Sequence, residues 1–185
     1  MARGRPSKKQ QILDSARALF IERGYQGTTV DLVVQQAGVS KPTVYSHFAS
    51  KQVLWQAMLE QTIEAAEQQR NAIDAAVDDW LGAILEAYRL LAAQPEMLAV
   101  YRIMLGERHK MESGAWQLFD TFEQGLERWC GSVLEAHQAG LDDGQRFVLR
   151  ALCREGILQP AMRDQEGPDT VRLRALIARA VGVLA

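Results

Sequence analysis

The sequence contains few of the residues that form metal centres, disulfides or redox sites. Its 185 residues include two cysteines, Cys130 and Cys153, and three histidines, at positions 47, 109 and 137. The cysteines do not have the spacing of a metal or redox motif, and a structural disulfide is unusual in the cytosol. We therefore expect no metal and no cofactor.

Targeting and membrane-spanning segments are also missing. No apolar run approaches the length that crosses a bilayer. The first residues are basic and polar and lack the apolar stretch of a signal peptide. These absences predict a cytoplasmic protein.

Signs of catalysis are equally scarce. The three histidines lie far apart, and the sequence has neither a nucleophile motif nor a glycine-rich loop that could hold a phosphate. The many carboxylates are typical of solvated helix faces. We therefore expect a protein that is not an enzyme.

What the chain does have is an uneven distribution of charge. Of its 21 Lys/Arg and 23 Asp/Glu, residues 1–55 hold eight basic and three acidic side chains. These residues thus carry a formal charge of +5, and the rest of the chain carries −7. A basic region joined to an acidic body indicates a polyanionic partner for the basic region, with chance unevenness as the alternative.

Apolar residues recur at helical spacing along nearly the whole chain, and no alternating strand pattern or internal repeat is present. The first helix is predicted to begin at the cap Ser7, with Gln10 completing a capping box, and to end at Gly24. The second is predicted to have Thr28 as its N-cap, with Asp31 reaching back to it. The fold class is therefore all-α, with about nine helices.

A turn at Gly38 and a third helix capped by Ser40 complete a helix-turn-helix pattern. Pro42 fits the first helical turn, where a missing N–H has no partner to lose. Ser50 caps a fourth helix, predicted to run from residue 51 to about 75 and to bridge to the rest of the chain. Helix N-termini attract phosphate, so the caps at Ser40 and Ser50 are candidate anion sites.

The third helix and its flanks are rich in side chains that can bind phosphates or base edges. These are Lys41, Thr43, Tyr45, His47 and Lys51. A short helix with such a surface fits the major groove of DNA.

The run from Ile12 to Leu59 resembles the DNA-binding domain of the tetracycline-repressor (TetR) family. The shared motifs are F-x-x-x-G-Y-x-G-T-T at 20–29, A-G-V-S at 37–40, Y-x-H-F at 45–48 and S-K at 50–51. The resemblance implies a DNA-binding domain over residues 1–52, with its helix-turn-helix at about 29–48, and a helical regulatory and dimerisation domain over 53–185. Pro42 departs from the family, which commonly has glycine there.

Carried over by position, the resemblance implies two kinds of DNA contact. Phosphate contacts are implied for Thr29, Tyr45, His47 and Lys51. Base contacts are implied for Lys41, Thr43 and Val44. The alternatives are that Tyr45 packs between helices and that His47 stabilises the end of its helix.

Basic residues also precede and begin the first helix. Arg3 and Arg5 lie on a short arm with glycine and proline, and Lys8 follows the cap. Such arms bind the minor groove, where narrow A·T tracts concentrate negative potential. A solubilising tail is the alternative.

The last two predicted helices, 145–159 and 169–184, are the candidates for a dimer interface. The first is apolar around too much of its circumference for one neighbour, and a two-fold bundle of four helices would bury the excess. The candidate residues are Phe147, Leu149, Leu152, Leu158, Leu173, Leu176, Ile177 and Val181. Burial inside a larger monomer core is the alternative.

Members of the family commonly release DNA when a small molecule enters a cavity in the C-terminal domain. By analogy, the cavity walls would include Trp80, Tyr88, Tyr101, Met104, Trp116, Phe119 and Phe122. Aromatic and Met side chains suit a largely hydrophobic effector, although the same spacing is typical of an ordinary core. A polar end of the effector could be held by Arg102, His109 or Gln117.

The sequence thus predicts a homodimeric repressor that binds a pseudopalindromic operator and is released by its effector. Release would be a population shift away from the dimer whose recognition helices stand about 34–36 Å apart. The fourth helix would act as the lever. One alternative is a redox-sensing regulator that uses Cys130 and Cys153. Another is a protein that binds DNA without preference, against which the acidic body argues.

Overall fold

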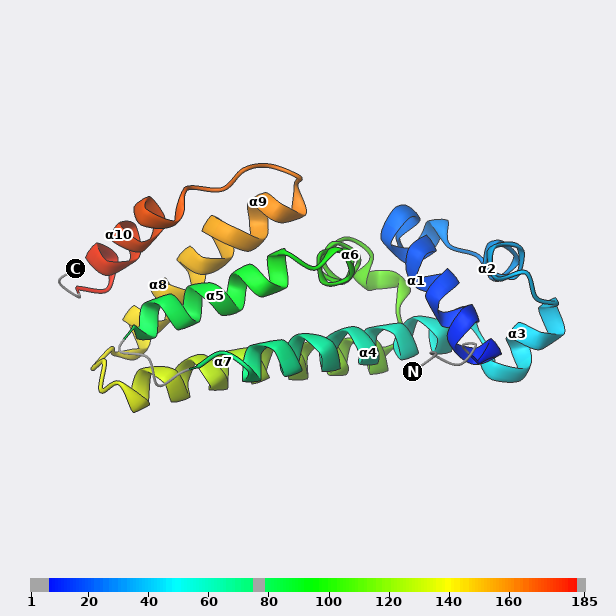
Figure 1. The fold of residues 1–185 in the computed structure, drawn as a ribbon, viewed down its shortest axis with the longest axis horizontal. Helices are drawn as coiled ribbons and strands as arrows, with labels where there is room; N and C mark the ends of the chain where they lie inside the picture. Colours follow the sequence, from blue (N-terminus) through cyan, green and yellow to red (C-terminus); the bar gives the residue numbers. More distant parts are fainter. Residues whose placement is uncertain (1–6, 75–78, 183–185) are drawn as a thin grey trace, which may run out of the picture. The chain divides into compact units, whose positions relative to one another are not determined.

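A computed structural model describes residues 7–74 and 79–182, and these are helical almost throughout (Figure 1). The first four helices are α1 (Lys8–Gly27), α2 (Val30–Ala37), α3 (Lys41–His47) and α4 (Lys51–Asn71). Then follow α5 (Trp80–Ala92), α6 (Pro95–Gly106), a 3₁₀ turn (Arg108–Lys110) and α7 (Ser113–Ala136). The chain continues through α8 (Asp143–Cys153), a π-helical segment (Arg154–Leu158), α9 (Gln159–Met162) and α10 (Thr170–Ala180). The all-α prediction is confirmed, and Arg3 and Arg5 lie outside the described residues.

The chain forms two compact units. The first comprises the described residues up to Glu64 together with Ala99–Asp120, and the second comprises Ala65–Leu98 together with the residues from Thr121 onward. Within the described ranges, no helix is both long enough and apolar enough to span a membrane.

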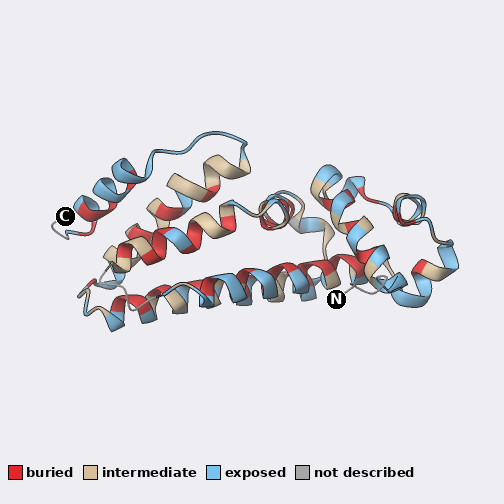
Figure 2. Ribbon diagram, viewed as in Figure 1, coloured by how far each residue is buried: buried red, intermediate tan, exposed pale blue. Residues whose placement is uncertain are grey.

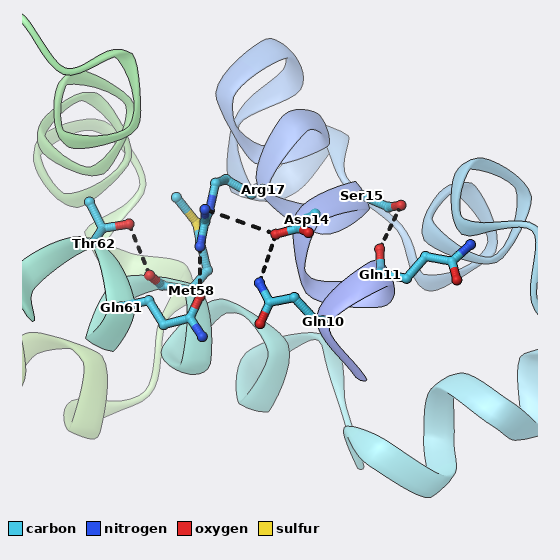
Figure 3. A network of polar contacts seen from close by, with 8 residues as sticks. All are labelled: Gln10, Gln11, Asp14, Ser15, Arg17, Met58, Gln61 and Thr62. Carbon is cyan, nitrogen blue, oxygen red and sulfur yellow. Dashed lines mark hydrogen bonds and ion pairs between the residues drawn. The ribbon is translucent and has the colours of Figure 1, made fainter. Parts of the chain in front are cut away.

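The start of α1 follows the prediction in part. The Ser7 hydroxyl accepts a hydrogen bond from the Gln10 backbone N–H at 3.2 Å, so the cap is confirmed. The Gln10 side-chain amide instead donates to Asp14 at 2.8 Å (Figure 3). Further along α1, the Arg17 guanidinium donates to the Gln61 amide oxygen at 2.7 Å, which ties α1 to α4 (Figure 3).

The corner between α1 and α2 corrects one prediction. Gly24 has a φ of 71°, which interrupts the regular helix as expected. The N-cap of α2 is Thr29, whose hydroxyl accepts from the Leu32 N–H at 3.2 Å, so the prediction of Thr28 was wrong. Thr28 is buried, and its hydroxyl donates to the Gly24 carbonyl at 2.8 Å. Two adjacent threonines can both cap, and only packing decides which one turns inward.

An aromatic cluster forms the centre of the first unit. The ring of Phe20 lies 5.1 Å from that of Trp55 in an edge-on contact, and the ring of Tyr25 lies 6.0 Å from Trp55. All three side chains are buried. Aromatic pairs in this geometry contribute about 0.5–1.5 kcal/mol beyond their burial. The cluster therefore fixes α1, α4 and the corner after Gly24 as one block.

The second unit departs from the expected boundaries at three places. The helix predicted to reach residue 75 ends at Asn71. The helix predicted over 145–159 begins at Asp143, passes into the π-helical segment and continues to Met162. A Cβ atom placed on Gly156 would lie 2.6 Å from a methyl group of Leu173, so this segment allows α10 to approach closely. Leu184 of the last predicted helix lies outside the described residues.

Candidate nucleic-acid interface

Helices α2 and α3 are joined by a tight turn. Gly38 adopts the left-handed conformation, with φ 62° and ψ 35°. Ser40 then caps α3: its hydroxyl accepts from the Thr43 N–H at 3.3 Å and lies 2.7 Å from the Thr43 hydroxyl. Glycine and serine at these two positions therefore set the short turn and the start of α3.

Helix α3 contacts the core through only a small part of its surface. Most of α3 is exposed or intermediate (Figure 2). Of its seven residues, Val44 alone is buried, and Phe48 packs inward directly after the helix. Val44 is 1% exposed, so the residue predicted to lie near base edges is instead an anchor in the core. The reason is its four-residue spacing from Phe48, which places both side chains on the inner face.

The remaining side chains of α3 face outward. Lys41 and His47 are exposed, Tyr45 is 45% exposed, and Thr43 is half-buried. Tyr45 is thus available to a partner. Thr29 and Lys8, from the list of candidate DNA contacts, are also exposed.

Lys41 already has an anionic partner within the chain. Its ammonium lies 2.8 Å from an Asp31 carboxylate oxygen, and both side chains are mostly exposed. This hydrogen bond raises the pKa of Lys41. A phosphate or a base acceptor would have to compete with Asp31 for this lysine, and the sequence alone did not reveal that competition.

Lys51 is oriented toward the corner after Gly24. Its ammonium donates to the Tyr25 carbonyl at 3.0 Å and lies 4.2 Å from the centroid of the Tyr25 ring. Partial burial lowers the pKa of Lys51, against the opposite effect of Glu107. The preceding Ser50 hydroxyl accepts from the Val53 N–H at 3.2 Å. Lys51 therefore holds the corner in place as well as standing at a candidate anion site.

The seven residues predicted to line an effector cavity are mostly core residues in this structure. Tyr88, Tyr101, Met104, Phe119 and Phe122 are buried, and Trp80 and Trp116 are half-buried. The Tyr101 and Phe119 rings meet edge-on at 5.2 Å in the first unit. The suggested polar anchors Arg102, His109 and Gln117 are all exposed.

A cavity of about 570 Å³ lies elsewhere, between the end of α4 and α5 in the second unit. Its described lining includes Gln69, Ala83 and Leu90, along with the carboxylates of Asp79 and Glu86, and none of the seven predicted residues. Asp79 caps α5 at the Gly82 N–H and pairs with Arg174 at 2.8 Å. Aromatic spacing in the sequence thus did not locate this cavity.

The candidate dimer residues divide into two groups. Within the single chain, the side chains already buried are Leu149, Leu158, Leu173, Ile177 and Val181. Leu152 is half-buried, whereas Phe147 is 64% exposed and Leu176 is 44% exposed. Val171 on α10, which was not among the candidates, is 77% exposed. Helix α10 packs against α8 within the chain, so one face of α10 is buried and its other face is exposed.

Both cysteines are free thiols in the core of the second unit. Burial raises the pKa of Cys130 to about 12, and it does the same for Cys153. Because the thiolate is the form that reacts with oxidants, neither residue is activated in this environment.

Comparison with known proteins finds a family that the N-terminal helices match. Residues 12–58 match the family described as bacterial regulatory proteins, tetR family. The transcriptional activator FasR of Mycolicibacterium smegmatis is 28% identical over 154 residues, which cover 73% of this chain and 65% of FasR. The transcriptional repressor Rv1474c of Mycobacterium tuberculosis is 35% identical over 101 residues, which cover 49% of this chain and 54% of the repressor. The chain thus spans about half to two thirds of these relatives.

A solved structure shows that the likeness in fold extends beyond the N-terminal helices. The regulator FadR from Bacillus subtilis, in complex with stearoyl-CoA, aligns with a TM-score of 0.62 and 24% identity. The alignment covers 95% of this chain and 99% of FadR.

Proposed function

We propose, from the match of residues 12–58 to the tetR family of bacterial regulatory proteins, that the chain is a sequence-specific DNA-binding regulator of transcription. The observation that carries the proposal is the exposure of α3. Val44 is its single buried residue, and Lys41, Tyr45 and His47 face outward. A helix anchored in this way can enter the major groove without disturbing the core beneath it.

Two kinds of contact follow from the chemistry of the exposed groups. Tyr45 and His47 would donate to phosphate oxygens and set the register of the protein on the duplex. Thr43 and Lys41 would meet base edges, with Lys41 leaving Asp31 to do so. Because Val44 is buried, it would support this surface from behind.

The operator would be read by a homodimer. One helix-turn-helix covers few base pairs, and a two-fold pair covers a pseudopalindrome. The uncovered side chains of Phe147, Val171 and Leu176 supply an apolar surface for the second copy. In this proposal residues 1–52 bind DNA, and residues 53–185 dimerise and regulate, in the cytoplasm where the operator lies.

We further propose that the protein is a repressor, released by a small and largely hydrophobic effector. The interior of the chain supplies apolar and aromatic side chains, and FadR, which shares the fold, is bound to stearoyl-CoA in its own structure. An effector that prefers a dimer with different spacing would shift the population and lower the affinity for the operator.

Selection from random duplexes tests the DNA-binding proposal directly. The purified full-length protein should be a dimer by light scattering and should enrich a pseudopalindrome with half-sites about one helical turn apart. The selection should be run at about 0.15 M salt, where non-specific phosphate binding is weak. A monomeric protein that enriches no sequence under these conditions would refute the proposal.

A further inference from the structure

A carboxylate from outside the matched segment bonds to the corner between α1 and α2. Glu107 directly follows α6, and its backbone N–H donates to the Ile103 carbonyl at 2.8 Å. Its side-chain oxygens accept from two successive backbone N–H groups, that of Tyr25 at 2.9 Å and that of Gln26 at 2.8 Å. Such bonds to a charged acceptor are stronger than bonds between neutral groups.

The local backbone is built for this approach. Gly24 has non-helical dihedrals, φ 71° and ψ −176°, which interrupt the regular hydrogen bonding of α1. A Cβ atom at Gly24 would lie 2.7 Å from a Glu107 carboxylate oxygen, so a side chain there would displace the carboxylate from this position. The two N–H groups after the break point to Glu107, as the first N–H groups of a helix point to a cap.

The same corner is held from its other side by Lys51. The Lys51 ammonium donates to the Tyr25 carbonyl at 3.0 Å, so both polar groups of Tyr25's backbone have a charged partner. The Tyr25 ring meanwhile packs edge-on against Trp55. Loss of Glu107 would leave two N–H groups without their acceptor and would remove a negative charge that acts on Lys51.

The corner determines where the helix-turn-helix begins. Thr28 closes it through a hydrogen bond to the Gly24 carbonyl, and the next residue, Thr29, is the cap of α2. We infer that Glu107 is a positioning residue for DNA binding: by clamping the N–H groups of Tyr25 and Gln26, it sets the start of α2 and hence the placement of α3. The set of residues that positions the DNA-binding helices is therefore discontinuous and includes Glu107, which follows α6. This inference rests on the proposed function.

Three full-length variants test the inference. Glu107→Ala removes both acceptors, and Glu107→Gln keeps one oxygen and the shape. Glu112→Ala is the matched control, because Glu112 is exposed and its charge also acts on Tyr25. Two readouts are needed, namely affinity for the selected operator and hydrogen exchange at the Tyr25 and Gln26 amides.

Glu107→Ala should lower operator affinity by about tenfold or more and speed exchange at these two amides, because two charge-assisted bonds are lost. Glu107→Gln should have an operator affinity and exchange rates between those of Glu107→Ala and the wild type. If the alanine variant fails to fold, the glutamine variant still tests the inference. Glu112→Ala should match the wild type in both readouts.

Unchanged affinity in both Glu107 variants would overturn the inference. An equal loss in Glu112→Ala would do the same, because net charge alone would then explain the result. Failure of the wild-type protein to bind any duplex would instead refute the proposed function, and exchange at the two amides would still show whether the clamp exists.

Discussion

Helix α3 of the first unit and the pair α8 and α10 of the second both leave much of their surface uncovered, but the chemistry of the two surfaces differs. On α3 the outward groups are an ammonium, a phenol and an imidazole, from Lys41, Tyr45 and His47. On α8 and α10 the uncovered groups include large apolar side chains, with Phe147 64% exposed and Val171 77% exposed, alongside the arginines of α10.

The difference shows what kind of partner each surface requires. The exposed polar side chains of α3 are stable without DNA, because water and, for Lys41, the Asp31 carboxylate satisfy them in the free protein. Exposed apolar area is unfavourable by about 25 cal/mol per Å² relative to burial, so large exposed apolar side chains favour a permanent partner. We therefore expect the apolar surface to be occupied at all times and α3 only when the operator is present.

The largest effect is expected from charging the apolar surface. Phe147→Glu combined with Leu176→Glu should convert the dimer into a monomer, because carboxylates would be buried without partners. Operator affinity should fall about 100-fold or more, since a monomer contacts only one half-site. Sedimentation and titration of the operator would measure both changes. Leu105→Glu is the control, since Leu105 is 61% exposed on α6 and lies in the other unit. A double variant that stays dimeric would remove the proposed interface.

Substitutions on α3 should have smaller effects that differ in kind. Tyr45→Phe should weaken binding several-fold on every duplex, because a phosphate contact carries no sequence information. Thr43→Ala should cost about 1 kcal/mol concentrated at one base pair. Affinities for the operator and its single-base variants would separate the two. Equal losses on specific and random DNA from both substitutions would show that the division into phosphate and base roles is wrong.

The ion pair between Asp79, the N-cap of α5, and Arg174 joins α5 to α10, the helix that carries Val171 and Leu176. The hydrogen bond from Arg174 lowers the pKa of Asp79, so its contribution to stability is present above the ordinary pKa near 3.8 and is lost as the pH falls through the folded value. Both side chains are more than one third exposed, so screening keeps the effect to a fraction of a kcal/mol.

Urea unfolding at pH 7 and pH 3 would measure this contribution. Asp79→Asn retains a side chain that can cap α5 and removes only the charge. The variant should be less stable than the wild type at pH 7, and this difference should be smaller at pH 3. A difference that is the same at both pH values would mean that the charge of Asp79 plays no part.

The smallest effect is expected at the two thiols. Because burial raises the pKa of Cys130 and of Cys153 to about 12, each is almost entirely protonated at neutral pH. Brief treatment with peroxide should leave operator affinity unchanged, with a Cys130→Ala, Cys153→Ala double variant as the control. Release of DNA by peroxide in the wild type alone would revive the redox-sensing alternative.

Local rules predicted much of the first unit. The cap at Ser7, the break at Gly24, the turn at Gly38 and the cap at Ser40 all follow from short-range backbone chemistry, and the structure has them. The choice between Thr28 and Thr29 did not follow, because neighbouring threonines have the same capping ability. The four-residue spacing of Val44 and Phe48 does indicate that both side chains face inward, as they do, whereas the position of Val44 within the family motif implied a base contact.

By itself, the sequence determined the all-helical class, the helix-turn-helix and the segregation of basic residues near the N-terminus, because these depend on spacings within a few turns of the chain. Only the tertiary structure decided which apolar side chains stay uncovered on α8 and α10, and that Glu107 binds the N–H groups of Tyr25 and Gln26. The physical reason is distance along the chain. A carboxylate more than 80 residues away has no periodic relation to the corner it binds, and its role exists only once the helices between them have packed.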